Sequence, residues 1–283
     1  MIKVYTTTKA LTADILALKA QGKIVGFVPT MGALHKGHLS LIEKCKANSD
    51  VIVASIFVNP TQFDNKTDLV KYPDTTRKDI TMLNAAGTNI LYLPTSKEVY
   101  PNGMQPTESF DFGKVTEVAE GAFRPGHFDG VAQVVGLLLD YVQPNKLFMG
   151  MKDFQQCAVI DQLIELRNMD IELVRCKTMR EPDGLAMSSR NMRLRKDERK
   201  SATILSKALQ HVKNNFKKEK IETLLSNAIK MIDETPHCKT VYIEVRHSKN
   251  MEKITDNSIE KDAVVLGAAT VGSVRLIDNM LLF

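Results

Sequence analysis

The chain has 283 residues, which is long enough for a sizeable buried core and more than one domain would typically need. Its composition is that of an ordinary globular protein, with 43% hydrophobic and 25% charged residues. The net charge of +5 is mildly basic and tryptophan is absent, so base-stacking platforms for nucleic acid are not suggested, and the charge suits an anionic small molecule equally well.

The first twenty residues contain no 18-residue apolar run and no signal-peptide core. We therefore expect a cytoplasmic protein that does not interact with a membrane. The four cysteines are far apart and form no CxxC pair, so neither a zinc site nor a disulfide framework is expected.

The first part of the chain alternates short apolar runs with stretches of helical periodicity. The apolar runs predict buried strands at 23–30, 50–60, 89–94, 145–150 and 171–178. The periodic stretches predict helices at 38–50, 66–87, 130–142 and 153–169, with Gly87 as the C-cap of the second. This alternation predicts an α/β fold in which helices cover both faces of a parallel sheet.

The composition changes near residues 180–195, where a charged stretch carries no strand signal. Beyond it, amphipathic helices are predicted at about 196–215 and 219–233, and antiparallel strands at 241–247 and within 263–282. We therefore predict two domains, 1–178 and 179–283. Residues 95–129 are rich in proline and glycine and are expected to be irregular, as functional loops often are.

The stretch PTMGALHKGH (29–38) places two histidines between a predicted strand and a predicted helix. A helix N-terminus offers unpaired N–H groups that bind phosphate, and Gly37 would let a phosphate approach the backbone. The imidazoles of His35 and His38 could donate hydrogen bonds as negative charge builds on phosphorus. The alternative is a histidine N-cap beside a tight turn. The motif is not a P-loop, because no GKS or GKT follows.

Polar residues follow other predicted strands at the end where open α/β sheets bind ligands. SIFVNPTQF (55–63) places Asn59 and Gln62 there, with a polar Asn-Pro turn as the alternative reading. GMKDFQQ (150–156) places Lys152 and Asp153 there, and Asp153 could equally be a helix N-cap.

Two loops add further candidates. MSSRN (187–191) offers two hydroxyls and an arginine as a clamp for a polyphosphate. RPGHFDGV (124–131) could bring Arg124 and His127 to the same pocket, or could simply form a Pro-Gly turn at a helix entry.

Five segments together resemble the pantoate–β-alanine ligases, also called pantothenate synthetases. These segments are PTMGALHKGHLSLI, SIFVNPTQF, RPGHFDGV, GMKDFQQ and DGLAMSSRN, in this order between about residues 23 and 195. The resemblance implies ATP-dependent condensation of (R)-pantoate with β-alanine through a pantoyl adenylate, with release of pyrophosphate and AMP. It also implies a Rossmann-like nucleotide-binding domain, a small α+β C-terminal lid domain and a homodimer.

The resemblance assigns roles residue by residue. His38 would be the proton donor of the first step, with His35 beside it on the phosphates. The substrate contacts that it implies are Gln62, Gln156 and Asn59. The ATP contacts that it implies are Met31, Gly32, Ala33, Leu34, His35, Lys36, Gly37, His38, Gly150, Met151, Lys152, Asp153, Met179, Met187, Ser188, Ser189 and Arg190.

The chain departs from the family pattern at two places. Met179 stands where the family often has a β-branched residue, at a backbone contact that tolerates methionine. Some members carry clustered aspartates in the helix after Tyr72-Pro73, and only Asp79 matches here. Mg²⁺ is therefore expected to be held mainly by ATP, with Asp79 as the one protein candidate.

Two other classes of function are weighed as alternatives. A nucleotidylyltransferase that moves AMP or CMP to a phosphorylated acceptor would share H-x-G-H. It would need cationic acceptor contacts where this chain has Asn59, Gln62 and Gln156. An RNA-binding module could be built on segment 193–220, but acidic residues alternate with its lysines, which is typical of a solvated helix face.

Overall fold

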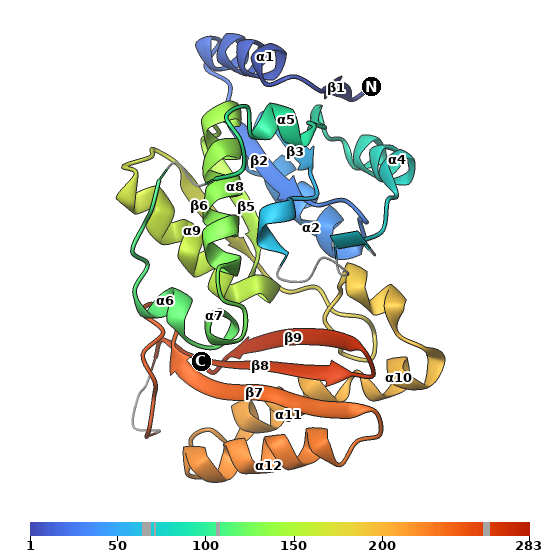
Figure 1. The fold of residues 1–283 in the computed structure, drawn as a ribbon, viewed down its shortest axis with the longest axis vertical. Coiled ribbons are helices and arrows are strands. Elements are labelled where there is room, and N and C mark those ends of the chain that lie inside the picture. The colour runs from blue at the N-terminus through green and yellow to red at the C-terminus, as the bar shows by residue number, and fades with distance from the viewer. Residues whose placement is uncertain (64–68, 71, 106–107, 257–260) are drawn as a thin grey trace. The chain divides into compact units, whose positions relative to one another are not determined.

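The computed structural model describes residues 1–63, 69–70, 72–105, 108–256 and 261–283. The chain divides into two compact units, whose elements are labelled in Figure 1. The first unit comprises residues 1–112, 124–151 and 156–177, and the second comprises 113–123, 152–155 and 178–283. Two short segments that precede the expected boundary at residue 178 thus group with the second unit.

The first unit is built on a six-stranded sheet of order β1-β4-β3-β2-β5-β6, in which every pair is parallel. Its strands are β1 (Lys3–Tyr5), β2 (Val25–Thr30), β3 (Val51–Ile56), β4 (Ile90–Tyr92), β5 (Lys146–Gly150) and β6 (Glu172–Cys176). Five of them confirm the parallel sheet predicted from the apolar runs. The sequence did not predict β1, because it is an edge strand of three residues that are not buried.

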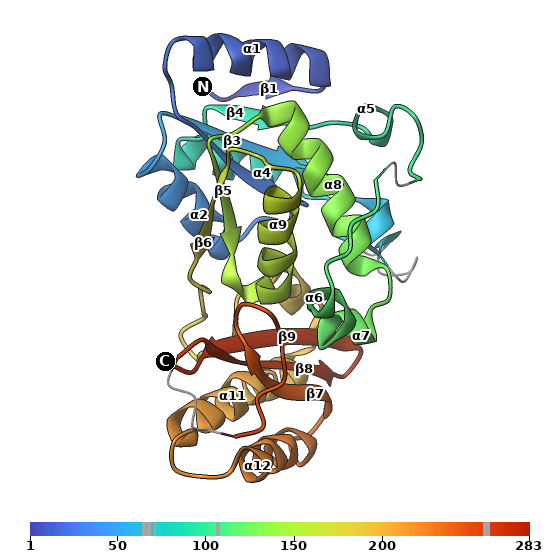
Figure 2. The same cartoon turned by 90° about the vertical axis from the view of Figure 1, so that its left-hand side faces the viewer.

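Helices cover both faces of this sheet (Figure 2). The helices of the first unit are α1 (Thr8–Ala20), α2 (Lys36–Lys46), α4 (Thr76–Ala86), α5 (Ser96–Val99), α8 (His127–Val142) and α9 (Phe154–Leu166), with the 3₁₀ turn η1 (Pro60–Gln62). Figure 2 shows α2 on one face and α8 and α9 on the other, and the first two residues of α9 group with the second unit. No helix among the described residues is both long and apolar enough to cross a membrane.

Several element boundaries differ from the prediction for local reasons. Helix α4 starts at Thr76 and not at 66, since a proline at 73 disfavours helical backbone in the residue before it. Residues 66–68 and 71 of that predicted helix lie outside the described part of the chain. Gly87 does end α4 in the left-handed conformation, as predicted. Residues 95–129 were predicted to be irregular, but they contain helices of only four residues and the start of α8, which begins at His127 and not at 130.

The second unit packs helices against a three-stranded antiparallel sheet of order β7-β8-β9. Its strands are β7 (Cys238–His247), β8 (Ala263–Val271) and β9 (Val274–Leu281). Its helices are α6 (Lys114–Glu117), α7 (Glu120–Phe123), α10 (Lys196–Ser201), α11 (Ile204–Asn215) and α12 (Ile221–Asp233), with the 3₁₀ helix η3 (Ser189–Arg193). The single helix predicted at 196–215 is therefore two helices. Leu209 and Val212 of α11 join Val265 and Leu276 of the sheet in one apolar core.

A buried ion pair fixes segment 113–123 within the second unit. Both oxygens of Glu120, which is 6% exposed, accept hydrogen bonds from the Arg275 guanidinium at 2.6 and 2.7 Å. The Tyr242 hydroxyl donates to the same carboxylate at 3.1 Å, and burial together with the Glu120 charge raises the pKa of Tyr242. A two-pronged pair of this kind holds the segment in one orientation on the sheet.

Helix α2 lies very close to strand β2. A Cβ atom at Gly26 would overlap the side chains of Ser49 and Cys45, so only glycine fits there. Burial raises the pKa of the Cys45 thiol to about 12, which keeps it an uncharged core group. This contact sets the position of α2, whose first residue follows the H-x-G-H histidine at 35.

We expect Gly26→Ala to lower the free energy of unfolding by about 1–3 kcal/mol, because the added methyl must displace α2 from β2. Chemical denaturation monitored by circular dichroism measures this. Gly136→Ala in α8 is the matched control, because its methyl would meet only the flexible ends of two side chains and helix propensity favours alanine by about 0.5–1 kcal/mol. Equal destabilisation by both variants would contradict the close approach at Gly26.

Candidate functional site

The loop after β2 is held in an uncommon backbone conformation by a buried carboxylate. Gly32 and Ala33 have φ values of 81° and 49°, in the left-handed region that non-glycine residues rarely adopt. Asp79 of α4 is 1% exposed and accepts hydrogen bonds from the backbone N–H groups of Ala33 and Leu34 at 2.9 and 3.0 Å. Thr75 donates its hydroxyl to the same carboxylate at 2.9 Å. Asp79 therefore anchors the loop that leads to the two histidines.

The two histidines cap the N-terminus of α2 reciprocally. His35 is the N-cap, and its Nδ1 accepts from the Gly37 N–H at 3.1 Å. His38 Nδ1 accepts in turn from the His35 N–H at 3.3 Å, and the ring centroids are 4.1 Å apart. The arrangement is a capping box in which imidazoles take the places usually held by serine or threonine and glutamate. The histidine N-cap weighed as an alternative is thus present, and it involves both histidines.

This cap selects one tautomer of each neutral ring. A ring nitrogen that accepts a hydrogen bond carries no proton, so the proton of each neutral imidazole sits on Nε2. Each ring then has an Nε2–H donor on the side opposite the backbone that it caps. The pair thus presents two directed donors at a helix N-terminus, where the backbone dipole already favours an anion.

The turn after β3 is organised around Asn59, which is 1% exposed. Its amide nitrogen donates to the Gly130 carbonyl at 3.2 Å and to Gln62 Oε1 at 3.3 Å, and its oxygen accepts from the Tyr100 hydroxyl at 2.6 Å. The Gln62 amide nitrogen lies 3.1 Å from Met31 Sδ. Gln62 therefore joins the turn after β3 to the loop after β2, and Asn59 directs the Gln62 side chain.

Arg124 and His127 fix the backbone of Gln62, a role that the sequence left undecided. His127 Nδ1 lies 2.9 Å from the Gln62 carbonyl oxygen and must donate to it, because a carbonyl only accepts. His127 Nε2 then has no proton and accepts from Arg124 Nη1 at 3.0 Å. Arg124 also donates from Nη2 to the Gln62 carbonyl at 3.3 Å.

The first unit gathers part of the predicted site at one edge of its sheet. Strands β3, β2 and β5 are adjacent and parallel, so their carboxyl ends lie side by side where ligands bind in such sheets. The candidates in this unit are Met31, Gly32, Ala33, Leu34, His35, Lys36, Gly37, His38, Asn59, Gln62, Gly150, Met151 and Gln156. Lys36 is exposed, whereas Gln156 on α9 is half-buried.

The second unit holds the other group of candidates. These are Lys152, Asp153, Met179, Met187, Ser188, Ser189 and Arg190. Met187 N–H donates to the Met179 carbonyl at 2.9 Å, which closes residues 179–187 into a hairpin. Ser188 caps η3 by accepting from the Arg190 N–H at 3.3 Å. Lys152 Nζ lies 3.5 Å from Asp153, and both side chains are partly exposed.

The described residues do not offer a metal site of their own. They contain no group of three or more histidine, cysteine, aspartate or glutamate side chains placed to hold an ion. Both oxygens of Asp79, the one metal candidate, already accept from backbone N–H groups. The carboxylate is therefore better explained as an anchor of the loop than as a metal ligand.

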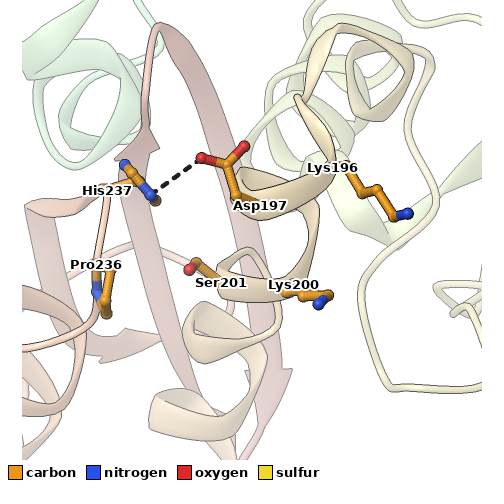
Figure 3. A pocket seen from close by; sticks show the side chains of 6 residues that line it. All are labelled: Lys196, Asp197, Lys200, Ser201, Pro236 and His237. Carbon is orange, nitrogen blue, oxygen red and sulfur yellow. Dashed lines mark ion pairs between the residues drawn. The ribbon is translucent and has the colours of Figure 1, made fainter.

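A separate pocket of the second unit has none of the predicted residues in its lining (Figure 3). It is lined by Lys196, Asp197, Lys200, Ser201, Pro236 and His237. His237 Nε2 lies 3.2 Å from Asp197, and both lysine side chains extend away from that pair in Figure 3. The pocket is thus distinct from the candidate site.

Known proteins match the chain along nearly its whole length. A family model described as "Pantoate-beta-alanine ligase" matches residues 3–281. The pantothenate synthetase of Bacteroides fragilis (strain YCH46) is 42% identical over 281 residues, which cover 99% of this chain and 98% of that protein. The crystal structure of pantothenate synthetase from Thermus thermophilus is similar with a TM-score of 0.92 and 34% identity, covering 100% of both chains.

A further similar structure is that of a complex with ligands. It is the pantoate–β-alanine ligase from Francisella tularensis, described as complexed with "Beta-gamma ATP" and β-alanine. Its TM-score to this chain is 0.83 at 33% identity, and the match covers 100% of this chain and 98% of that one.

We expect Asp79→Asn to speed amide hydrogen exchange at Ala33 and Leu34 by about 10- to 100-fold, because a charge-assisted hydrogen bond contributes about 1.5–3 kcal/mol. The two N–H groups bond different oxygens of Asp79, and asparagine replaces one of these oxygens with an NH2 group that cannot accept. Hydrogen–deuterium exchange followed by NMR measures this. Asp74→Asn is the control, since the exposed Asp74 bonds Thr76 at the start of the same helix. Unchanged exchange at Ala33 and Leu34 in Asp79→Asn would contradict the anchoring role.

Proposed function

The chain belongs to the pantoate–β-alanine ligase family, and we propose that it condenses (R)-pantoate with β-alanine at the expense of ATP. In the first step a carboxylate oxygen of pantoate attacks the α-phosphorus of ATP, and pyrophosphate leaves. In the second step the amine of β-alanine attacks the acyl carbon of the pantoyl adenylate, and AMP leaves. Pantothenate is the product. Every atom of ATP is recovered in AMP and pyrophosphate, and AMP carries in addition one oxygen atom that comes from the pantoate carboxylate.

The geometric observation that best supports this proposal is the pair of imidazoles that cap α2. We propose that their Nε2–H groups donate to the ATP phosphates and that His38 stabilises the charge that builds on the leaving pyrophosphate. The donors are oriented before ATP arrives, because the same rings are already fixed by the helix backbone. No covalent bond between the enzyme and a substrate is then needed, and catalysis consists of positioning and charge stabilisation.

We propose that the polar groups at the ends of β3 and β5 hold the other substrates. Gln62 would bond pantoate and β-alanine, with its backbone held by Arg124 and His127, and Gln156 would bond pantoate. Uncharged amides can bond hydroxyl and carboxylate oxygens without acting as nucleophiles. Asn59 would orient the side chain of Gln62 through its hydrogen bond to Gln62 Oε1.

We propose that Mg²⁺ enters with ATP as part of the substrate. Mg²⁺ is usually bound through substrate phosphates and retained waters, with one or two carboxylates and not a full protein cage, and the described residues form no cage. Its contribution would be to neutralise the triphosphate charge.

We also propose that residues 1–178 and 179–283 act as a nucleotide-binding domain and a lid domain, and that the enzyme is a cytoplasmic homodimer. Five of the ATP candidates lie in 179–283, which supports a lid that contacts the nucleotide: Met179, Met187, Ser188, Ser189 and Arg190. All four cysteines lie among the described residues, are buried and form no disulfide, which fits a reducing compartment.

Pyrophosphate–ATP exchange tests the proposal directly. With Mg²⁺ and ATP, exchange of labelled pyrophosphate into ATP should require pantoate and should proceed without β-alanine. Adding β-alanine should then release AMP in equal amount to pantothenate. A folded, ATP-binding protein that shows no pantoate-dependent exchange, but transfers AMP to a phosphorylated acceptor, would support the nucleotidylyltransferase alternative.

Two substitutions at His38 separate the capping role of Nδ1 from the proposed donor role of Nε2. The Asn amide oxygen can replace Nδ1 as acceptor for the His35 N–H but cannot supply a donor at the Nε2 position. We therefore expect His38→Asn to keep its melting temperature and to lose about 10²- to 10³-fold in exchange rate, the cost of one removed donor to a developing charge. His38→Gln, which can place an N–H near the Nε2 position, should retain more activity than His38→Asn. Equal activity of His38→Asn and wild type would refute a role for Nε2.

A further inference from the structure

Strand β9 carries two adjacent buried polar residues, which lie between the apolar residues Ile277 and Met280. Asp278 is 4% exposed and Asn279 is 6% exposed, within the sequence RLIDNML. Removing a carboxylate and an amide from water is costly unless both are hydrogen-bonded. The partners of these two side chains therefore indicate what the pair contributes.

Asp278 holds the hairpin formed by residues 179–187. Its two carboxylate oxygens accept from the Arg180 guanidinium at 2.6 and 2.9 Å. Arg180 also donates to the Gly184 carbonyl at 3.1 Å, across the tip of the hairpin. A single buried carboxylate thus orients Arg180, and Arg180 closes the hairpin whose ends are Met179 and Met187.

Asn279 holds a different segment. Its side-chain amide donates to the Lys152 carbonyl at 3.0 Å. Its backbone N–H donates to Asp278 Oδ1 at 2.8 Å, and its carbonyl accepts from Arg180 Nη2 at 3.4 Å. Asp278 and Asn279 therefore connect Lys152 to the hairpin. Lys152 and the hairpin are separated in the sequence, but both belong to the second unit.

We propose that Asp278 and Asn279 are positioning residues for the ATP half-reaction. They fix the spacing between Lys152 and the Met179–Met187 hairpin, two segments that we propose contact ATP, while touching neither ATP nor the reacting atoms themselves. The inference rests on the proposed function, because it assigns these segments to the nucleotide. The inference adds Asp278 and Asn279 to that function as the residues that align the two segments.

A purely structural role is the competing explanation, and the same strand supplies a matched control. Arg275 of β9 pairs with the buried Glu120 through two hydrogen bonds, as Arg180 pairs with Asp278. The hydrogen bonds of this second pair join β9 to segment 113–123, which is not among the segments proposed to contact ATP. Glu120→Gln therefore disturbs a buried arginine–carboxylate pair of the same sheet and leaves the hydrogen bonds of Asp278 and Asn279 in place. The Glu120 backbone N–H, which this substitution keeps, donates to Gln155 near Lys152.

The experiment compares Asn279→Ala, Asp278→Asn and Glu120→Gln in the full chain. We expect Asn279→Ala and Asp278→Asn to raise the KM for ATP by about 10-fold or more, because small misplacements of binding groups carry large kinetic costs. The KM for β-alanine should change less than about 2-fold. Glu120→Gln should lower the melting temperature but leave the KM for ATP within about 2-fold of wild type. Asn279→Gln keeps an amide donor and should recover part of the ATP affinity lost in Asn279→Ala.

Direct titration of ATP in a calorimeter, without pantoate, separates this inference from the proposed reaction. A weaker ATP affinity in Asn279→Ala but not in Glu120→Gln supports positioning, even if the acid substrate proves to be other than pantoate. Unchanged ATP affinity in a folded Asn279→Ala overturns the inference. Equal loss of ATP affinity in all three variants also overturns it, since general destabilisation would then explain the effect. If Asp278→Asn does not fold, Asn279→Ala decides the question alone.

Discussion

The site depends on the need of a helix to find partners for its first N–H groups. In α2 those partners are the Nδ1 atoms of His35 and His38, each of which caps the backbone near the other. An aspartate would satisfy the helix equally well, but an ionised carboxylate has no proton to donate. Imidazole has two nitrogen atoms, so one atom can serve the fold while the other serves a phosphate. The same hydrogen bonds therefore stabilise the helix and orient the proposed catalytic donors.

The loop before α2 is also held in place by residues outside it. Its left-handed residues, Gly32 and Ala33, need support from outside the loop, and Asp79 supplies it from α4. Gly26 allows α2 to lie close on β2, which fixes where its N-terminus emerges from the sheet. On the other side, His127 and Arg124 hold Gln62 by its backbone and Asn59 holds it by its side chain. Asp79 thus holds the loop before α2, and Asn59, Arg124 and His127 hold Gln62.

The sequence predicted what depends on local pattern and missed what depends on distant contacts. The apolar runs of β2, β3 and β5 and the order of the motifs led to the parallel sheet and to His35 and His38. Edge strand β1 and the four-residue helices were missed, because so few residues carry no periodicity. The anchoring role of Asp79 and the contacts of Asp278 and Asn279 join segments remote in the chain. The only signal for the last two was a pair of polar residues between the apolar residues Ile277 and Met280.

The division of the chain into units has a consequence for exchanging parts between relatives. The second unit is not one continuous stretch, since Glu120 and Lys152 belong to it yet precede residue 178. A fragment beginning at residue 179 would deprive Arg275 of its carboxylate and Asn279 of its acceptor. A chimera joined at residue 178 would likewise combine a β9 from one parent with segments 113–123 and 152–155 from the other. Compatible recombination between two members of this family therefore requires those two short segments to be inherited together with the C-terminal third.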